Sequence, residues 1–379
     1  MEGFRSVFAD LEDPRTGNAQ RHDLHEILLI ALCTILCGGE DCSDMAVFGR
    51  AKEPFLRQFL RQFLRQFLRL KHGIPSHDTF SRVFRLLDPA QFHACFLAFM
   101  RQFAEGCQAV VAIDGKTLRR SFDRAAGLSP LHLVSAWAVE QRLVLGQVAV
   151  ADQSNEITAV PQLLRMLRLE GVMVTADALN CQRDIAQQVI DQGGDYVLAL
   201  KGNQGTLFED VKLFLDDPAV ALETADTTDG EHGRIEVRRA ALSTDIAFLQ
   251  ESHAWPGLQA IGKVTAMRET KDKTSQKTRY FLLSQALTPE RFATIVRAHW
   301  GIENGLHWVL DVTLNEDQMR NRKDNGPENL ALLRRLALNL AALEPSKDSM
   351  RGKLKRAGWD NHFLAQMLAQ FAAPQRRLP

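Results

Sequence analysis

The stretch "VVAIDGKTLRRS", residues 110–121, begins as an apolar run and becomes polar at Asp114. Consecutive apolar residues, mostly β-branched, predict a buried strand that ends at this acid. The Gly-Lys-Thr that follows matches the end of a phosphate-binding loop, but such a loop needs a glycine five residues before its Gly-Lys pair. Val110 occupies that position, which disfavours nucleotide binding and directs attention to Asp114.

Downstream segments continue this strand into an α/β domain. Apolar segments at 131–140 and 142–151 predict two further strands of a meander, and they are followed by helix, strand, helix and strand up to residue 202. Crossover connections after a meander predict a mixed five-stranded sheet with helices on both faces, in an RNase H-like order. The fold class expected is therefore α/β with an RNase H-like core.

The pattern of apolar and polar residues divides the chain into five parts. Helical periodicity fills the N-terminal part, where Ser76 is a candidate N-cap for a helix at 76–87 that suits either DNA recognition or a small bundle. A tandem FLRQ repeat occupies 55–70. The predicted parts are a helical, candidate DNA-binding domain (1–105), the first part of the core (106–205), a β-rich insertion (206–292), the last helical part of the core, which carries Glu303 (293–345), and a basic helical tail (346–379).

Composition sets few limits on function. The chain has 46 basic and 46 acidic residues, whereas a nucleic-acid binder usually carries a basic excess. A local surplus of Lys and Arg after residue 320 fits either a solvated helical face or a phosphate-binding surface. The longest apolar run, 27–36, is too short to cross a bilayer, and the first residues lack the order of a signal peptide, so we expect a cytoplasmic protein without a membrane partner.

Acidic residues follow two of the predicted strands. Asp114 ends the first strand and Asp177 ends the fourth, and in this sheet order both lie at the carboxyl edge, where active sites collect. Such oxygen ligands suit Mg²⁺. A later helix carries His299, Glu303 and His307 at intervals of four, which predicts one shared face. This face fits a zinc site, a third acid supplied by Glu303 alone, or simple packing.

Five motifs in order, "AIDGKTLRRS", "VTADALNCQ", "YVLALKGNQ", "HGRIEVR" and "RAHWGIENGLHWVLDV", give the chain a resemblance to the DDE transposases of bacterial insertion sequences, in the group containing the H-repeat-associated proteins. The resemblance implies a catalytic triad of Asp114, Asp177 and Glu303 that binds two Mg²⁺ ions, for which Mn²⁺ can substitute. It further implies a homodimer that cuts and joins the DNA ends of an insertion element at a DNA target.

The resemblance leaves the DNA contacts less well defined. Related transposases carry a Tyr-x2-Arg-x3-Glu-x6-Lys signature, and around Glu303 its other positions hold Val296, His299 and Leu310. The residues we expect at DNA phosphates are Lys116, Lys201, Asn203, Arg297, His299 and His307. Two alternatives stay open, a catalytically inactive DNA-binding remnant and a zinc-dependent hydrolase built on His299, Glu303 and His307.

Overall fold

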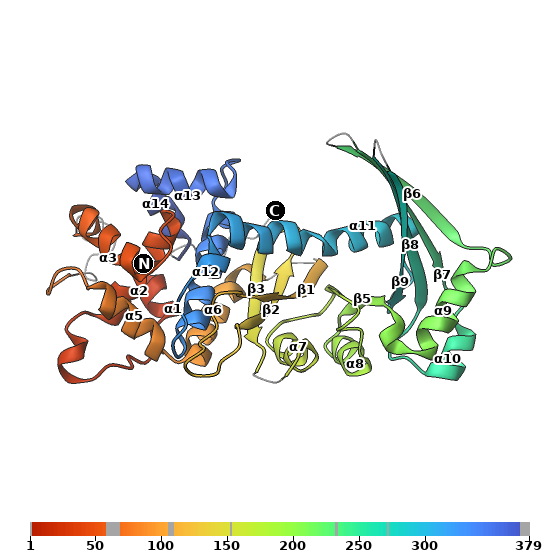
Figure 1. Ribbon diagram of the computed structural model, residues 1–379, viewed down its shortest axis with the longest axis horizontal. Helices are drawn as coiled ribbons and strands as arrows, with labels where there is room; N and C mark the ends of the chain where they lie inside the picture. The colour runs from red at the N-terminus through yellow and green to blue at the C-terminus, as the bar shows by residue number, and fades with distance from the viewer. Residues whose placement is uncertain are drawn as a thin grey trace.

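A computed structural model describes residues 2–57, 69–104, 110–151, 154–231, 234–270 and 273–371. Most of the FLRQ repeat lies outside these ranges. The molecule is elongated, with a helical body at one end, a sheet in the middle and long antiparallel strands at the other end (Figure 1). None of the helices within the described ranges is both long and apolar enough to span a membrane.

The described residues form the following elements. The α-helices are α1 (Glu2–Val7), α2 (Leu24–Leu36), α3 (Cys42–Ala51), α5 (His77–Leu86), α6 (Pro89–Ala104), α7 (Glu156–Arg165), α8 (Arg183–Asp191), α9 (Thr206–Asp216), α10 (Ala247–His253), α11 (Pro289–His299), α12 (Gly326–Leu343), α13 (Met350–Trp359) and α14 (Asn361–Leu368). The strands are β1 (Val110–Thr117), β2 (His132–Ala138), β3 (Leu143–Ala149), β4 (Met173–Ala176), β5 (Asp195–Leu200), β6 (Glu223–Glu231), β7 (Arg234–Ser243), β8 (Ala260–Thr270) and β9 (Lys273–Leu283). Short 3-10 or π segments are η1 (Gly17–Gln20), η2 (Gly202–Gln204), η3 (Glu303–His307), η4 (Val309–Thr313), η5 (Glu316–Gln318) and η6 (Ala369–Phe371).

One mixed sheet runs through most of the molecule. Its strand order is β3-β2-β1-β4-β5-β9-β8-β7-β6, with β1, β4 and β5 parallel and the other neighbours antiparallel. We expected a five-stranded sheet with a β-rich insertion. The insertion is β-rich, but β9 pairs with β5, so its strands continue the same sheet to nine strands among the described residues.

β1 is longer than its apolar run predicts. It continues beyond Asp114 to Thr117, because β2 pairs with it along the whole length, as far as Thr117 opposite His132. The prediction that Asp114 ends the strand was therefore wrong by three residues. Asp177, in contrast, directly follows β4, as predicted.

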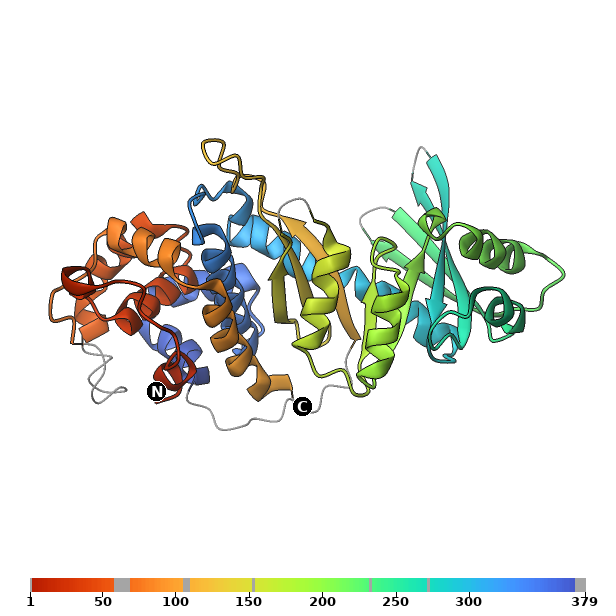
Figure 2. The same ribbon diagram turned by 90° about the horizontal axis from the view of Figure 1, so that it is seen from below.

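Helices cover both faces of the strands β1 to β5. α7 and α8 lie on one face, while α11 crosses the other (Figures 1 and 2). α11 begins at a side-chain cap, since the Thr288 hydroxyl accepts a hydrogen bond from the Arg291 amide and Pro289 stands at the first helical position. This helix leads directly to the predicted third acid.

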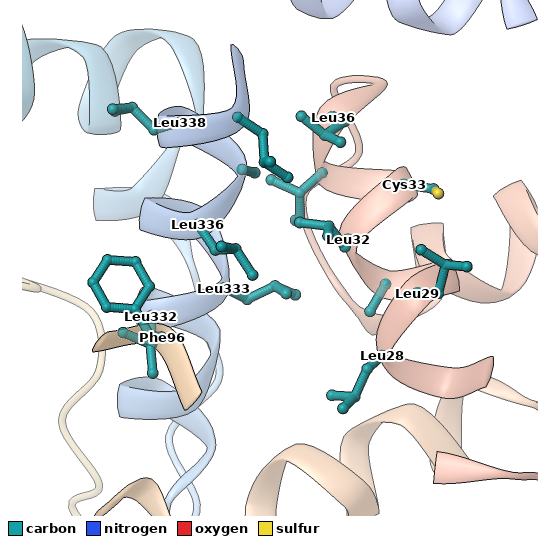
Figure 3. Close-up of a cluster of buried hydrophobic side chains, with 14 of the residues drawn as sticks. Leu28, Leu29, Leu32, Cys33, Leu36, Phe96, Leu332, Leu333, Leu336 and Leu338 are labelled. Carbon is teal, nitrogen blue, oxygen red and sulfur yellow. The ribbon is translucent and has the colours of Figure 1, made fainter. Parts of the chain in front are cut away.

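The two ends of the chain share one hydrophobic core. α2 is apolar on nearly all sides, and its leucines, including Leu32 and Leu36, face Leu333 and Leu336 of α12 (Figure 3). α13 and α14 pack into the same cluster, so residues from 350 to 371 belong to the helical body and do not form a separate tail. Part of the basic surplus after residue 320 is also internal: Arg334, Arg335 and Lys353 are buried.

Candidate active site

A cavity of about 260 Å³ lies between the sheet and α11. It is lined by three acids, three cations and a tryptophan: Asp114, Asp177, Glu303, Lys201, Lys277, Arg279 and Trp300, together with apolar residues of the sheet. All three acids of the predicted triad therefore border one cavity, although they come from positions 189 residues apart along the chain.

The parallel register of β1 and β4 places the two aspartates next to each other. Ala112 pairs with Thr175 and Ile113 pairs with Ala176, so the next step brings Asp114 beside Asp177. Residues at the same register of adjacent parallel strands point to the same face of the sheet. Here that face is the one crossed by α11, from whose carboxyl end Glu303 follows.

The helix that carries Glu303 changes its winding at that residue. The Trp308 amide donates to the Glu303 carbonyl and the Leu314 amide donates to the Val309 carbonyl, both in the i to i+5 pattern of a π-helix. Our prediction of one shared face for His299, Glu303 and His307 assumed an unbroken α-helix. His299 bonds to Thr175 of β4 at 3.0 Å, and His307 lies 3.6 Å from the Asp114 carboxylate of β1.

The surroundings of Asp114 favour its protonated form. Burial raises the pKa of Asp114 from its ordinary value of 3.8 to about 7, and the negative charges of Glu156, Asp177 and Glu303 act in the same direction. The Gly115 amide opposes the shift by hydrogen bonding. A carboxyl group held near neutrality by neighbouring acids marks a place where a cation would be stabilised.

A fourth carboxylate, missed from the sequence, supports the site from the α7 side. Glu156 accepts a hydrogen bond from His132 at 2.8 Å and another from the Asn180 amide at 3.0 Å. Asn180 is fully buried and also donates its backbone and side-chain N–H groups to one oxygen of Asp177. These bonds lower the pKa of Glu156, which stays charged, and they hold Asp177 in place.

Gly115 leaves the space that this network occupies. A Cβ at Gly115 would lie 2.2 Å from a Glu156 carboxylate oxygen and 2.5 Å from His132 Nε2. The glycine of the Gly-Lys-Thr segment is thus needed for close packing of a side chain, and has no phosphate-binding turn to form. No signal in the linear sequence joins residues 132, 156 and 180, because they come together only when β1, β2, β4 and α7 assemble.

Lys116 does not lie where a DNA phosphate could reach it. Its side chain is buried, and its Nζ lies 2.7 Å from Asp311, 3.1 Å from Asp317 and 3.7 Å from Glu316. Glu316 also pairs with buried Arg335 at 2.6 Å. Our prediction of a DNA contact at Lys116 is corrected on this ground: the lysine ties β1 to the segment that follows the third acid.

Among the residues that the structure describes, no group of three His, Cys, Asp or Glu side chains converges closely enough to hold a metal ion. This holds both for the set His299, Glu303 and His307 and for the three acids of the predicted triad. The acids Asp114, Asp177 and Glu303 surround the cavity without meeting at one point. Their chemistry still suits a hard cation such as Mg²⁺, which prefers oxygen ligands and keeps several waters.

Comparison with known protein families decides the affiliation of the chain. Residues 5–100 match the family described as DDE_Tnp_1-associated, and residues 105–340 match the Transposase DDE domain. The chain belongs to the DDE transposase family. The match to the Transposase DDE domain spans β1 to β5, the insertion and the helices up to α12.

Individual relatives of this DDE transposase family member agree with the assignment. The "H repeat-associated putative transposase YhhI" of Escherichia coli is 36% identical over 92% of this chain and 93% of its own length. An "Uncharacterized protein in dhlA 3'region" of Xanthobacter autotrophicus is 42% identical over 75% of this chain and 95% of its own length. The predicted resemblance to the H-repeat-associated group is thus confirmed. A solved piggyBac transposase synaptic complex with hairpin DNA is similar at a TM-score of 0.44 and 12% identity, covering 99% of this chain and 78% of that one.

The other expected DNA contacts of this transposase differ in their surroundings. Burial lowers the pKa of both His299 and His307 to about 4, so both rings are neutral at physiological pH and offer no positive charge to a phosphate. Lys201 is exposed and lines the cavity, and Arg297 is exposed on α11. The Asn203 amide donates to the Ala178 carbonyl at 2.8 Å, which steadies the loop after Asp177.

Proposed function

We propose that this chain is a DNA transposase that cuts and joins the ends of an insertion element by metal-assisted phosphoryl transfer. Its catalytic part would be an RNase H-like core formed by β1 to β5, with the later strands as an insertion. The observation that carries the proposal is the placement of Asp114, Asp177 and Glu303 around one cavity, with the pKa of Asp114 raised to about 7 by burial and neighbouring acids. Family membership supports the same reaction class.

In this proposal the three carboxylates would hold two Mg²⁺ or Mn²⁺ ions. When bound, such ions lower the pKa of a water and stabilise the oxygen that leaves phosphorus. The chain's own residues prepare the site in three ways. Asn180 orients Asp177, Glu156 keeps a negative charge beside Asp114, and Lys116 fixes β1 against the segment after Glu303.

Substrate binding would use exposed cations around the cavity. Lys201 follows β5 and lines the cavity, and Arg297 is exposed on α11 one helical turn before Trp300. We assign phosphate contacts to both. We propose that Asn203 positions the loop after Asp177. Lys116, His299 and His307 are not among the proposed phosphate contacts. The helical domain 1–105 is proposed as the part that recognises element ends, with the active species a homodimer in the cytoplasm.

Cleavage of DNA that carries the sequences flanking this chain's own gene tests the function. Asp114→Asn, Asp177→Asn and Glu303→Gln should each abolish strand cleavage in Mg²⁺ while retaining DNA binding, because each ligand loses its negative charge and keeps its shape. Glu251→Gln, an exposed acid on α10, is the matched control and should cleave as the unmodified chain does. Cleavage by any of the three variants would remove that residue from the triad, and no cleavage by the unmodified chain would favour an inactive remnant.

A further inference from the structure

Three basic residues, Lys201, Lys277 and Arg279, line the cavity beside the three acids and are called the basic wall. The register of the sheet determines where they lie. Continuing the β4–β5 ladder past Ala176 places Asp177 beside Ala199 of β5, and Ala199 pairs with Phe281 of β9. Two residues before Phe281 on the same face of β9 is Arg279, and the continued β5–β9 register sets it beside Lys201. Both cations, like the acids, line the cavity.

Lys277 extends this basic wall by one more step along β9. It has the same strand parity as Arg279 and Phe281, and all three border the cavity. The wall therefore combines Lys201, which directly follows β5, with two cations of the insertion, and only Lys201 is one of the predicted DNA contacts. The continuation of the sheet through β9 is what brings the insertion into the site.

None of these three cations forms a salt bridge in the part of the chain that the structure describes. Arg279 is half-buried, and burial lowers its pKa while the charges of Glu303 and Glu236 act in the opposite direction. A half-buried guanidinium without a paired carboxylate is costly unless an anion partners it. The buried Lys116, by comparison, has three carboxylates within reach.

Trp300 holds Arg279 in position. The guanidinium carbon lies 4.3 Å from the centroid of the Trp300 ring, a stacked arrangement that leaves the edge of the guanidinium free to donate hydrogen bonds. Trp300 itself stands in the turn between α11 and Glu303 and is 37% exposed. The aromatic ring thus links the basic wall to the segment that carries the third acid.

We propose that Arg279 and Lys277, with Lys201, bind backbone phosphates of the DNA strand whose reacting phosphate lies at the three acids. This inference rests on the proposed function and extends it, because it assigns DNA binding at the site to strand β9 of the insertion. Two strand spacings of about 4.8 Å and one two-residue step of about 6.8 Å put Arg279 about 12 Å from Asp177 in the sheet. At about 3.4 Å per nucleotide along a duplex, this is about three nucleotides away from the reacting phosphate.

Cations at that distance offset the repulsion between the acids and the DNA. Three carboxylates repel an approaching phosphodiester, and a bound cation offsets the repulsion only at the acids themselves. A basic wall a few nucleotides away attracts the strand without competing for the metal ligands. Because phosphate contacts carry no sequence information, the binding it supplies is independent of the sequence of the element ends.

Salt-dependent DNA binding by the full chain tests this role. Fluorescence anisotropy would follow binding to a labelled 20-nucleotide oligothymidine and to a 20-base-pair duplex of arbitrary sequence, in EDTA so that no strand is cleaved. Each lost phosphate contact should reduce the slope of log affinity against log salt by about 0.9 for the duplex or about 0.7 for the single strand. At 0.1 M salt the first value corresponds to about eightfold weaker binding.

Arg279→Ala and Lys277→Ala should each show this reduction. Lys212→Ala, which removes an exposed lysine of α9 away from the cavity, is the matched control and should keep the slope of the unmodified chain. Arg279→Lys retains the charge and should keep the slope as well, which separates loss of a phosphate contact from damage to the fold. Lys277 is exposed, so its truncation leaves the packing intact.

The outcomes separate this inference from the proposed function. Equal slopes for Arg279→Ala, Lys277→Ala and Lys212→Ala would overturn the basic wall and leave the triad untouched. Cleavage that survives Asp114→Asn would overturn the triad, whereas the slopes measured in EDTA would still decide the role of β9. A chain that binds neither probe would overturn the basic wall, while cleavage of its own element ends would still decide the proposed function.

Discussion

Gly115→Ala tests the packing of the site against α7. The added Cβ would lie 2.2 Å from a Glu156 carboxylate oxygen and 2.5 Å from its Cδ, far inside the closest contact that real side chains show. Glu156 must therefore move by about 1 Å, which breaks its 2.8 Å bond to His132. Loss of one charged hydrogen bond costs about 1.5–3 kcal/mol, and crowding adds about 1–3 kcal/mol.

We expect Gly115→Ala to lower the free energy of unfolding by about 3 kcal/mol, measured by urea denaturation at neutral pH. Gly146→Ala is the matched control, because Gly146 is also a strand glycine of this sheet and its nearest neighbour is a flexible Leu163 methyl group at 3.1 Å. The control should lose less than about 1 kcal/mol, since such a methyl group can move aside.

A double-mutant cycle identifies the cause of the loss. In a Glu156→Ala background the carboxylate is absent and His132 keeps only its bond to Thr117, so Gly115→Ala should cost about 2 kcal/mol less than in the unmodified chain. An undiminished cost in that background would refute the reasoning. So would a Gly115→Ala loss no larger than that of Gly146→Ala.

Three further predictions concern stability. The pKa of Asp114 rises from 3.8 to about 7 in the folded state, so its contribution to stability is present below about pH 4 and is lost as pH rises through 7, by about 4 kcal/mol. Asp114→Asn should therefore have a higher melting temperature than the unmodified chain at pH 8 in EDTA. Equal melting temperatures there would contradict the shift. Lys116→Met removes a buried cation from Asp311, Asp317 and buried Glu316 and should cost about 3 kcal/mol in urea denaturation, whereas exposed Lys355→Met should cost almost nothing. Thr288→Ala removes the cap of α11 and should cost about 1 kcal/mol in the same assay, and no change would mean that the cap is dispensable.

Short-range patterns were enough to locate β1 to β5, apart from the last three residues of β1, and the positions of Asp114 and Asp177. The apolar run before Asp114 and the run before Asp177 are local signals, because burial of a strand requires consecutive apolar side chains whatever lies beside it. The order of strands and helices predicted a mixed sheet with the first strand central, and β1 lies between β2 and β4 in the observed sheet. Patterns of this kind also placed Glu303 on a helix after the insertion.

The sequence alone did not predict which residues surround each polar side chain of the site. Lys116 is of a residue type that commonly binds phosphate at a surface, yet it is surrounded by three carboxylates from 195 to 201 residues further along the chain. The turns that begin at Glu303 have π-helical winding where we expected an unbroken α-helix. Neither fact has a local signature, since each depends on which elements pack together.

By itself the sequence determined the α/β class, the approximate positions of β1 to β5, the two aspartates that follow their apolar runs and, through its motifs, membership of a transposase family. Only the tertiary structure decided that the insertion continues the sheet, that Glu156 and Asn180 support Asp177, and that Arg279 faces the acids across the cavity. The physical reason is range. Apolar periodicity acts over neighbouring residues, whereas charge and hydrogen bonding at this site act between side chains up to about 200 positions apart, which only strand pairing brings within a few ångströms.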